Sequence, residues 1–104
     1  QVNTSGEITK SGISIEEIED FIDEIKDYKH IKVRGLMSLP EIKSNIDEQR
    51  DSFLSLKKVF NQLKKNKPEL DTLSIGTTLD MEAAIAEGAT FVRIGTAIFG
   101  SRNI

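Results

Sequence analysis

Thr72-Leu-Ser-Ile-Gly-Thr-Thr-Leu-Asp-Met-Glu-Ala-Ala-Ile-Ala-Glu-Gly-Ala-Thr-Phe-Val-Arg-Ile-Gly-Thr-Ala-Ile-Phe-Gly100 is the stretch that decides the fold. It holds two short apolar runs, 72–75 and 90–94, which are typical of buried strands. Between them Asp80 is a helix-capping residue, and Gly88 is typical of a helix end. The stretch therefore predicts strand, helix, strand and a last helical turn over 95–97. Parallel strands need such a crossover, and a helix supplies it.

The rest of the chain continues this alternation. Ser14 and Glu17 form a capping box before apolar residues at helical spacing, so we expect a helix over 14–26. A buried strand over 31–39 follows, with its carboxyl end near Met37. The stretch 44–65 carries one apolar stripe and predicts a long amphipathic helix. A short strand at Val2-Asn3 would precede them all.

The predicted order is four strands alternating with three full helices, which makes the fold α/β with a parallel sheet. An open flavodoxin-like sheet and half of a barrel both fit this rhythm. With 104 residues the chain is too short for a complete eight-stranded barrel, which needs about 250 residues. We expect residues 1–104 to form a single domain, and the alternation of strands and helices leaves both architectures open. Gln1 is expected to follow sequence that has been cut away.

Composition limits the partners. The formal net charge is −3, so no basic footprint for nucleic acid or an anionic membrane surface is present. The chain has no cysteine, which suits a reducing compartment, and no apolar run of about 20 residues that could span a bilayer. We therefore expect a cytoplasmic protein whose partner is a small molecule.

Polar groups and glycines follow both strands of the deciding stretch. Ser74 and Gly76 end the first strand, and Arg93, Gly95 and Thr96 end the second. Because parallel strands end at one rim, we expect these residues to gather there, with Met37 at the end of the preceding strand. Unpaired N–H groups at a helix start bind anions, and a glycine lets a phosphate approach the backbone. The pattern predicts a phosphate site, although ordinary strand-to-helix turns would use similar residues.

The runs 73–85 and 88–100 resemble the C-terminal signature of the pyridoxal phosphate homeostasis family. The segments Val2-Asn3, Lys10-Ser-Gly12 and Val33-Arg-Gly-Leu-Met37 resemble its preceding strands and loops, in the right order. This family is similar to the barrel domain of alanine racemase but lacks the second domain of the racemase. The resemblance implies that residues 1–104 are a single partial domain, the C-terminal half of a (β/α)8 TIM barrel. The resemblance implies that the intact protein binds pyridoxal 5′-phosphate and buffers or delivers it.

The resemblance also implies roles for single residues. Ser74, Gly95 and Thr96 would contact the cofactor phosphate, and Arg93 would face the pyridine nitrogen. A guanidinium stays charged at ordinary pH, so it would keep that nitrogen unprotonated and weaken the ring as an electron sink. The family pattern reads S-M-G-M-S, and here Ile75, Thr77 and Thr78 stand in its second, fourth and fifth places. Thr78, in the fifth place, retains a hydroxyl.

Other interpretations of single residues remain open. Arg93 could instead be a rim arginine paired with Asp71 or Glu82. His30 has no second histidine or cysteine at ligand spacing and is expected to be a solvated loop residue. The acidic residues of 16–24 could suggest a metal, but a solvated helix face explains them better.

The lysine that holds the cofactor covalently lies, by resemblance, in the half that this chain lacks. We therefore expect a cofactor-binding fragment with weak or no retention of its own and no catalytic residue. The alternative is an amino-acid racemase of the alanine type, which needs acid–base groups on both faces of the substrate. A third possibility is an independent α/β module. A half barrel would expose Leu36, Leu73 and Val92, so we expect self-association.

Overall fold

Helices and strands alternate along the chain as the sequence predicts. The computed structural model describes residues 1–6, 8 and 10–102. Its elements are a 3-10 turn η1 (Ile15–Glu17), α1 (Ile18–Ile25), β1 (Gly35–Met37), α2 (Ile46–Asn66), β2 (Thr72–Ser74), α3 (Met81–Ala86) and α4 (Thr96–Phe99). The predicted α/β class is therefore confirmed.

The two strands are parallel neighbours. β1 pairs with β2 in a register that sets Gly35 against Thr72 and Met37 against Ser74. A side chain at Gly35 would collide with the carbonyl oxygen of Thr72, so this register depends on the glycine. The predicted outer strands lie in chain order on either side. Val2 donates its N–H to the Met37 oxygen at 2.7 Å, and Phe91 forms a parallel bridge with Ser74.

The prediction of four regular strands is wrong in detail, because the described residues contain two strands of three residues each. Residues 31–34 stay irregular, since the chain beside them is the turn before β2, and Arg34 oxygen accepts from both Asp71 and Thr72 N–H groups. The segment 90–94 keeps only the Phe91 bridge. After this bridge the regular hydrogen-bond pattern between the strands ends. Gly76 has a φ of 98°, which is outside the strand conformation, and its oxygen accepts from Arg93 N–H.

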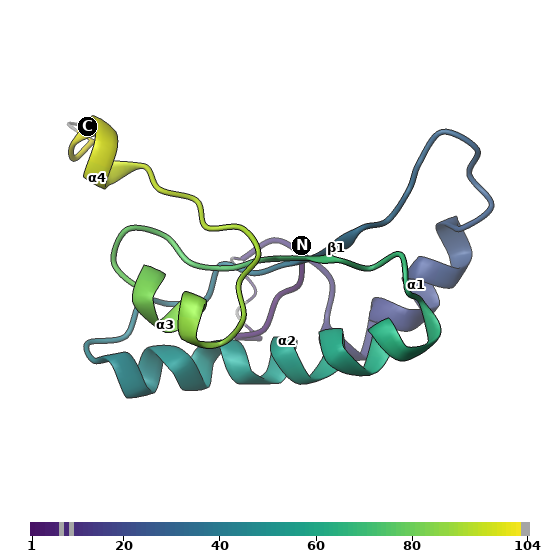
Figure 1. The fold of residues 1–104 in the computed structure, drawn as a ribbon, viewed down its shortest axis with the longest axis horizontal. Coiled ribbons are helices and arrows are strands. Elements are labelled where there is room, and N and C mark those ends of the chain that lie inside the picture. The colour runs from purple at the N-terminus through teal and green to yellow at the C-terminus, as the bar shows by residue number, and fades with distance from the viewer. Residues whose placement is uncertain (7, 9, 103–104) are drawn as a thin grey trace.

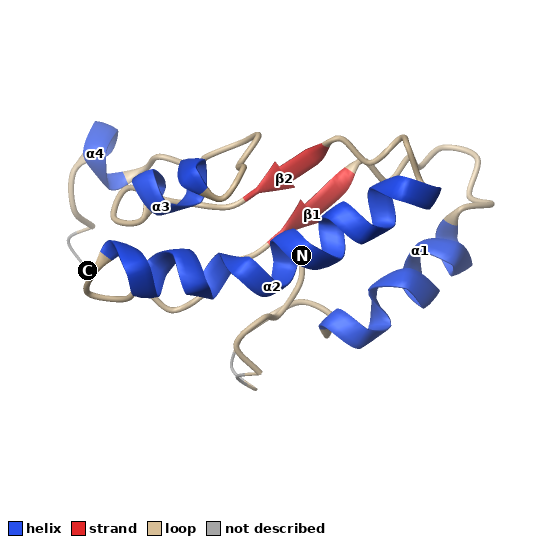
Figure 2. Cartoon of the chain, turned by 60° about the horizontal axis from the view of Figure 1, so that its bottom comes forward, coloured by secondary structure: helices blue, strands red, loops and turns tan. Residues whose placement is uncertain are grey.

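The helices cover one face of the strands. Figure 1 shows α2 and α3 below the strands with α1 beside α2, and Figure 2, with that side turned forward, shows α2 running alongside β1. α2 begins at the capping residue Asn45, whose side chain accepts from Glu48 N–H. The core joins α1, α2, α3 and the strands through Ile18, Phe53, Leu56, Leu70, Leu73, Ile75 and Ala84, each at most 1% exposed.

The two faces of the sheet differ in residue type. Leu36 and Leu73 are 7% and 1% exposed because they point toward the helices, so the expectation that they would be exposed is wrong. A hollow of about 270 Å³ is lined by Gln1, Arg34, Gly35, Leu36, Met37, Thr72 and Ser74. On the side of the strands away from α2, Figure 1 shows no helix of the described residues over β1. The exposed large apolar side chains lie elsewhere, with Phe91 61% and Phe99 83% exposed.

Candidate functional site

The carboxyl ends of the strands bring three predicted rim residues together. Ser74 ends β2, and Arg93 follows the Phe91 bridge beside it. Arg93 Nε donates to Ser74 Oγ at 3.1 Å, and Arg93 Nη2 donates to the carbonyl oxygen of Ser38, which directly follows β1, at 2.9 Å. The expectation that Met37, Ser74 and Arg93 share one rim is therefore confirmed.

Arg93 is held by neutral oxygens. Besides those two bonds, its Nη2 reaches the carbonyl oxygen of Ser74 at 3.4 Å. Within residues 1–6, 8 and 10–102, no carboxylate forms an ion pair with it. Asp71, one of the two rim partners considered from the sequence, pairs with Arg34 instead, with Nε and Oδ1 3.2 Å apart. Among the described residues, the positive charge of Arg93 therefore has no carboxylate partner.

The loop that opens α4 presents unpaired backbone donors. Within the described part of the chain, the N–H groups of Gly95 and Thr96 have no protein acceptor. Ala97 N–H donates to Thr78 Oγ1 at 3.2 Å, which joins this loop to the loop after β2. Gly95 has a φ of −115°, and no heavy atom lies within 4 Å of a Cβ built on it. The space above this glycine is therefore open.

Thr78 is the site residue that sequence reasoning placed only as a capping hydroxyl. Its contact with Ala97 puts it at the Gly95–Thr96 loop, whereas the hydroxyl of Ser74 is directed to Arg93. Both hydroxyls belong to one short stretch, Ser74 to Thr78, so their positions in the sequence could not separate their roles. Between the two residues lies Gly76, whose φ of 98° takes the chain out of the strand conformation.

The loop after β2 is shaped by the fold itself. Asp80 Oδ1 accepts from Thr77 N–H at 2.7 Å and from the Thr77 hydroxyl at 3.2 Å, which closes the turn before α3. Gly76 adopts a φ of 98°, and a Cβ built on it would lie 2.5 Å from Ala84 Cβ. Position 76 therefore requires a glycine for both its backbone conformation and its packing, whereas position 95 does not.

A buried carboxylate fixes α3, which follows this loop, against α2. Glu87 is 6% exposed, and it receives Arg50 Nε at 2.8 Å and Lys57 Nζ at 3.2 Å. The hydrogen bond from Arg50, assisted by Lys57, holds the pKa of Glu87 below its usual range despite the opposing effect of burial. The ion pairs therefore hold α3 and its preceding loop in place.

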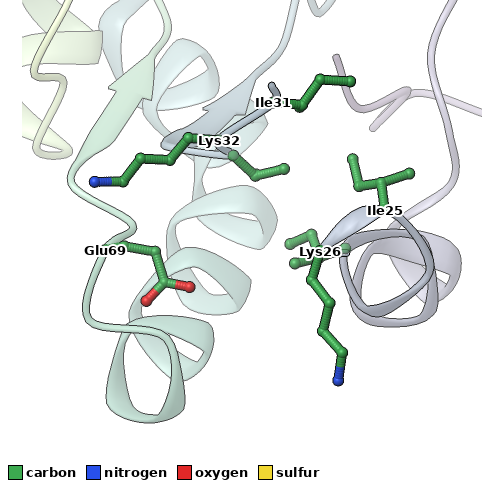
Figure 3. Close-up of a pocket in the computed structure, with 7 residues that line it drawn as sticks. Ile25, Lys26, Ile31, Lys32 and Glu69 are labelled. Carbon is green, nitrogen blue, oxygen red and sulfur yellow. The ribbon is translucent and has the colours of Figure 1, made fainter. Parts of the chain in front are cut away.

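A second pocket lies at the opposite end of the strands. It measures about 120 Å³ and is lined by Ile22, Ile25, Lys26, Ile31, Lys32, Val33 and Glu69. Figure 3 shows the amino groups of Lys26 and Lys32 pointing in different directions, so they do not converge on one anion. Ligands of parallel α/β sheets bind at the carboxyl ends of the strands. The Arg93 rim is therefore the stronger candidate site.

Other candidates gain no support. His30 is an exposed residue of the turn before β1, and its side chain makes no hydrogen bond to the described residues. The described residues hold no group of three or more His, Cys, Asp or Glu side chains placed to bind a metal. None of the helices in the described part of the chain is long and apolar enough to cross a membrane.

The fold is that of an α/β protein with parallel strands, and Ser74 and Arg93 lie together at the carboxyl ends of these strands. The chain belongs to the alanine racemase N-terminal domain family, whose model matches residues 1–103. It is 48% identical over 105 residues to the pyridoxal phosphate homeostasis protein of Haemophilus influenzae, covering 99% of this chain and 44% of that protein. The resemblance seen in the sequence is thereby confirmed.

Solved structures agree with this assignment. PipY of Synechococcus elongatus without PLP superposes with a TM-score of 0.83 at 27% identity, covering 96% of this chain and 47% of PipY. PipY with PLP bound gives a TM-score of 0.77 at 26% identity, covering 92% and 46%. The chain thus spans less than half the length of these relatives.

Proposed function

We propose that this chain is the phosphate-binding half of a cytoplasmic pyridoxal 5′-phosphate carrier or buffer, built as the C-terminal half of a (β/α)8 barrel. All three longer helices lie on one face of the sheet, as in a barrel, whereas a flavodoxin-like sheet has helices on both faces. The open face would then be the inner wall of the barrel.

The observation that carries the proposal is the pairing of two kinds of donor at one rim. Unpaired N–H groups of Gly95 and Thr96, next to the Thr78 hydroxyl, suit a phosphate. Arg93, fixed by neutral oxygens, suits an uncharged ring nitrogen. Pyridoxal 5′-phosphate has both acceptors, so the residues present fit the group. Ser74 belongs to this site through Arg93.

An arginine facing the ring nitrogen favours carriage, or at most racemase-type proton transfer, over transaminase chemistry. When bound, the cofactor supplies an electron-withdrawing ring, and a guanidinium that faces its nitrogen keeps it unprotonated and weakens that effect. Ser38, Ser74 and Thr78 offer hydroxyls, none of which is a base at neutral pH. An alanine-type racemase needs two groups that exchange protons on opposite faces of the substrate. We therefore propose binding without racemase activity for this chain.

Equilibrium binding tests the proposal. Each charge-assisted contact contributes about 1.5 to 3 kcal/mol at best, so inorganic phosphate and pyridoxine 5′-phosphate should bind in about the millimolar range. Pyridoxine 5′-phosphate has an alcohol in place of the aldehyde, so it does not react with surface lysines. Thr96→Ala and Thr78→Ala should each weaken both ligands, while His30→Ala should weaken neither.

Covalent chemistry provides the contradicting outcome. With pyridoxal 5′-phosphate itself, reduction with borohydride should leave no stoichiometric adduct at one particular lysine of this chain. Alanine should not be racemised in the same sample. A stoichiometric adduct at a single lysine, or equal binding by the wild type and Thr96→Ala, would contradict the assignment.

A further inference from the structure

The guanidinium of Arg93 is engaged along one edge only. An arginine has five N–H donors, one on Nε and two on each terminal nitrogen. Arg93 uses Nε toward Ser74 Oγ, and Nη2 toward the carbonyl oxygens of Ser38 and Ser74. Within the described residues, Nη1 has no acceptor. The protein thus binds the Nε–Nη2 edge, and Nη1 keeps its donors without an acceptor among the described residues.

Ser74 supplies the one side-chain acceptor in this grip. The other two acceptors are backbone carbonyls, which no side-chain substitution removes. Ser74 sits at the last position of β2, where pairing with Met37 and the bridge to Phe91 fix its backbone on both sides. The Cα of Ser74 is therefore held in place, and its hydroxyl is the acceptor that Arg93 Nε–H meets.

The backbone carbonyl of Ser38 is equally well fixed. Ser38 is fully buried, its N–H donates to Ser74 oxygen at 3.3 Å, and its oxygen receives Arg93. The carbonyl oxygens on either side of it accept hydrogen bonds from other segments. Met37 oxygen accepts from Val2 N–H, and Leu39 oxygen accepts from Lys10 Nζ. The segment after β1 thus cannot shift to follow Arg93, and the guanidinium must adapt to it.

We infer that Ser74 is a positioning residue, which aligns Arg93 toward the ring of the ligand and is not itself a phosphate contact. The inference rests on the proposed function for the identity of the ligand, but the positioning concerns this chain alone. Thr78, which reaches the Gly95–Thr96 loop, takes the phosphate-side role that the sequence pattern assigned to Ser74.

Two probes separate ring recognition from phosphate recognition. Inorganic phosphate reports only the loop, whereas pyridoxine 5′-phosphate also reports the ring. Ser74→Ala should lower the affinity for pyridoxine 5′-phosphate about tenfold, the effect of losing one hydrogen bond to a charged group, and leave inorganic phosphate unchanged. Thr78→Ala should lower both. Ser74→Thr, which keeps a hydroxyl, should restore the ring affinity.

A ligand-free measurement follows Arg93 directly. In the NMR spectrum of the free chain, the Arg93 Nε–H signal should exchange slowly with water because Ser74 Oγ accepts it. Ser74→Ala should speed this exchange about tenfold or more, by loss of the bond, and Ser55→Ala, an exposed serine on α2, should not. In an Arg93→Lys background, Ser74→Ala should cause no further loss of ring affinity.

The outcomes separate the two proposals. If Ser74→Ala weakens both probes equally and leaves the Nε–H signal unchanged, Ser74 is a phosphate contact and the inference is wrong. If the wild type binds neither probe, the proposed function fails, and the Nε–H signal alone decides the positioning role. Faster exchange in Ser74→Ala then supports the role, and unchanged exchange overturns it.

Discussion

The two loops of the candidate site each contain a glycine, and the structure predicts opposite consequences for replacing them with alanine. Gly76 needs a glycine for the fold, because its φ is 98° and an added Cβ would lie 2.5 Å from Ala84 Cβ. Gly95 has a φ of −115° and open space around it, so the fold does not require its glycine. A need for glycine at 95 would come from a ligand.

The magnitudes follow from these geometries. Forcing alanine into a left-handed conformation costs about 1 to 2 kcal/mol, and overpacking against Ala84 adds about 1 to 3 kcal/mol. Gly76→Ala should therefore lose roughly 3 kcal/mol of unfolding free energy. At about 4 to 8 °C per kcal/mol for a domain of this size, Tm should fall by roughly 12 to 24 °C. Gly95→Ala should stay within about 0.5 kcal/mol of the wild type.

Thermal unfolding followed by circular dichroism measures the first effect, and titration with inorganic phosphate measures the second. Gly95→Ala should fold as the wild type does but bind phosphate about tenfold more weakly, because its methyl group fills the space where the anion approaches and so costs a charge-assisted contact. The reasoning is refuted if Gly95→Ala unfolds as easily as Gly76→Ala, or if it binds phosphate as tightly as the wild type.

Three further predictions concern the fold. Glu87→Gln should lower the free energy of unfolding by about 1 to 2 kcal/mol at neutral pH. The loss is smaller than for a fully buried ion pair because Arg50 is half exposed, so its charge returns to water when the pair is broken. Because the pKa of Glu87 is lowered in the folded protein, the contribution of its carboxylate to stability is complete above the ordinary pKa and is lost as pH falls through the folded value. The unfolding free energies of the wild type and Glu87→Gln, measured with urea, should therefore converge at acid pH. Phe53→Ala should lose about 3 to 5 kcal/mol, whereas Leu79→Ala, at a side chain 71% exposed, should change stability by less than about 0.5 kcal/mol in the same unfolding measurement. Light scattering at micromolar concentration should show dimers or larger species, because Phe91 and Phe99 are exposed and the sheet edges are short of partners, and a strictly monomeric chain would contradict this.

The α/β order could be predicted because each signal was local. Ser14 and Glu17 form the expected capping box, and Gly88 ends α3 with a φ of 98°. The lengths of the strands could not be predicted in this way. A strand exists only where a neighbour pairs with it, and the shift of Arg93 onto Gly76 oxygen cut short the apolar run 90–94.

The site was predictable in part for a related reason. Parallel strands end at one rim, so Ser74 and Arg93 were expected to lie together, and they do. Which hydroxyl serves which partner depends on the turn at Gly76, and that is a property of the backbone in three dimensions. Ser38 carried no signal in the sequence, because its contribution to the Arg93 grip is a backbone carbonyl that every residue type possesses.

The central claim is that the ligand binds at the Gly95–Thr96 loop and the Arg93 rim. An NMR titration of the isotope-labelled chain with pyridoxine 5′-phosphate tests it most directly. The backbone amides of Gly95 and Thr96 and the side chain of Arg93 should show the largest shifts, and all should saturate with one dissociation constant. The largest shifts at Lys26 and Lys32, in the pocket at the opposite end of the strands, would contradict the claim, as would a titration that shifts no amide of the rim.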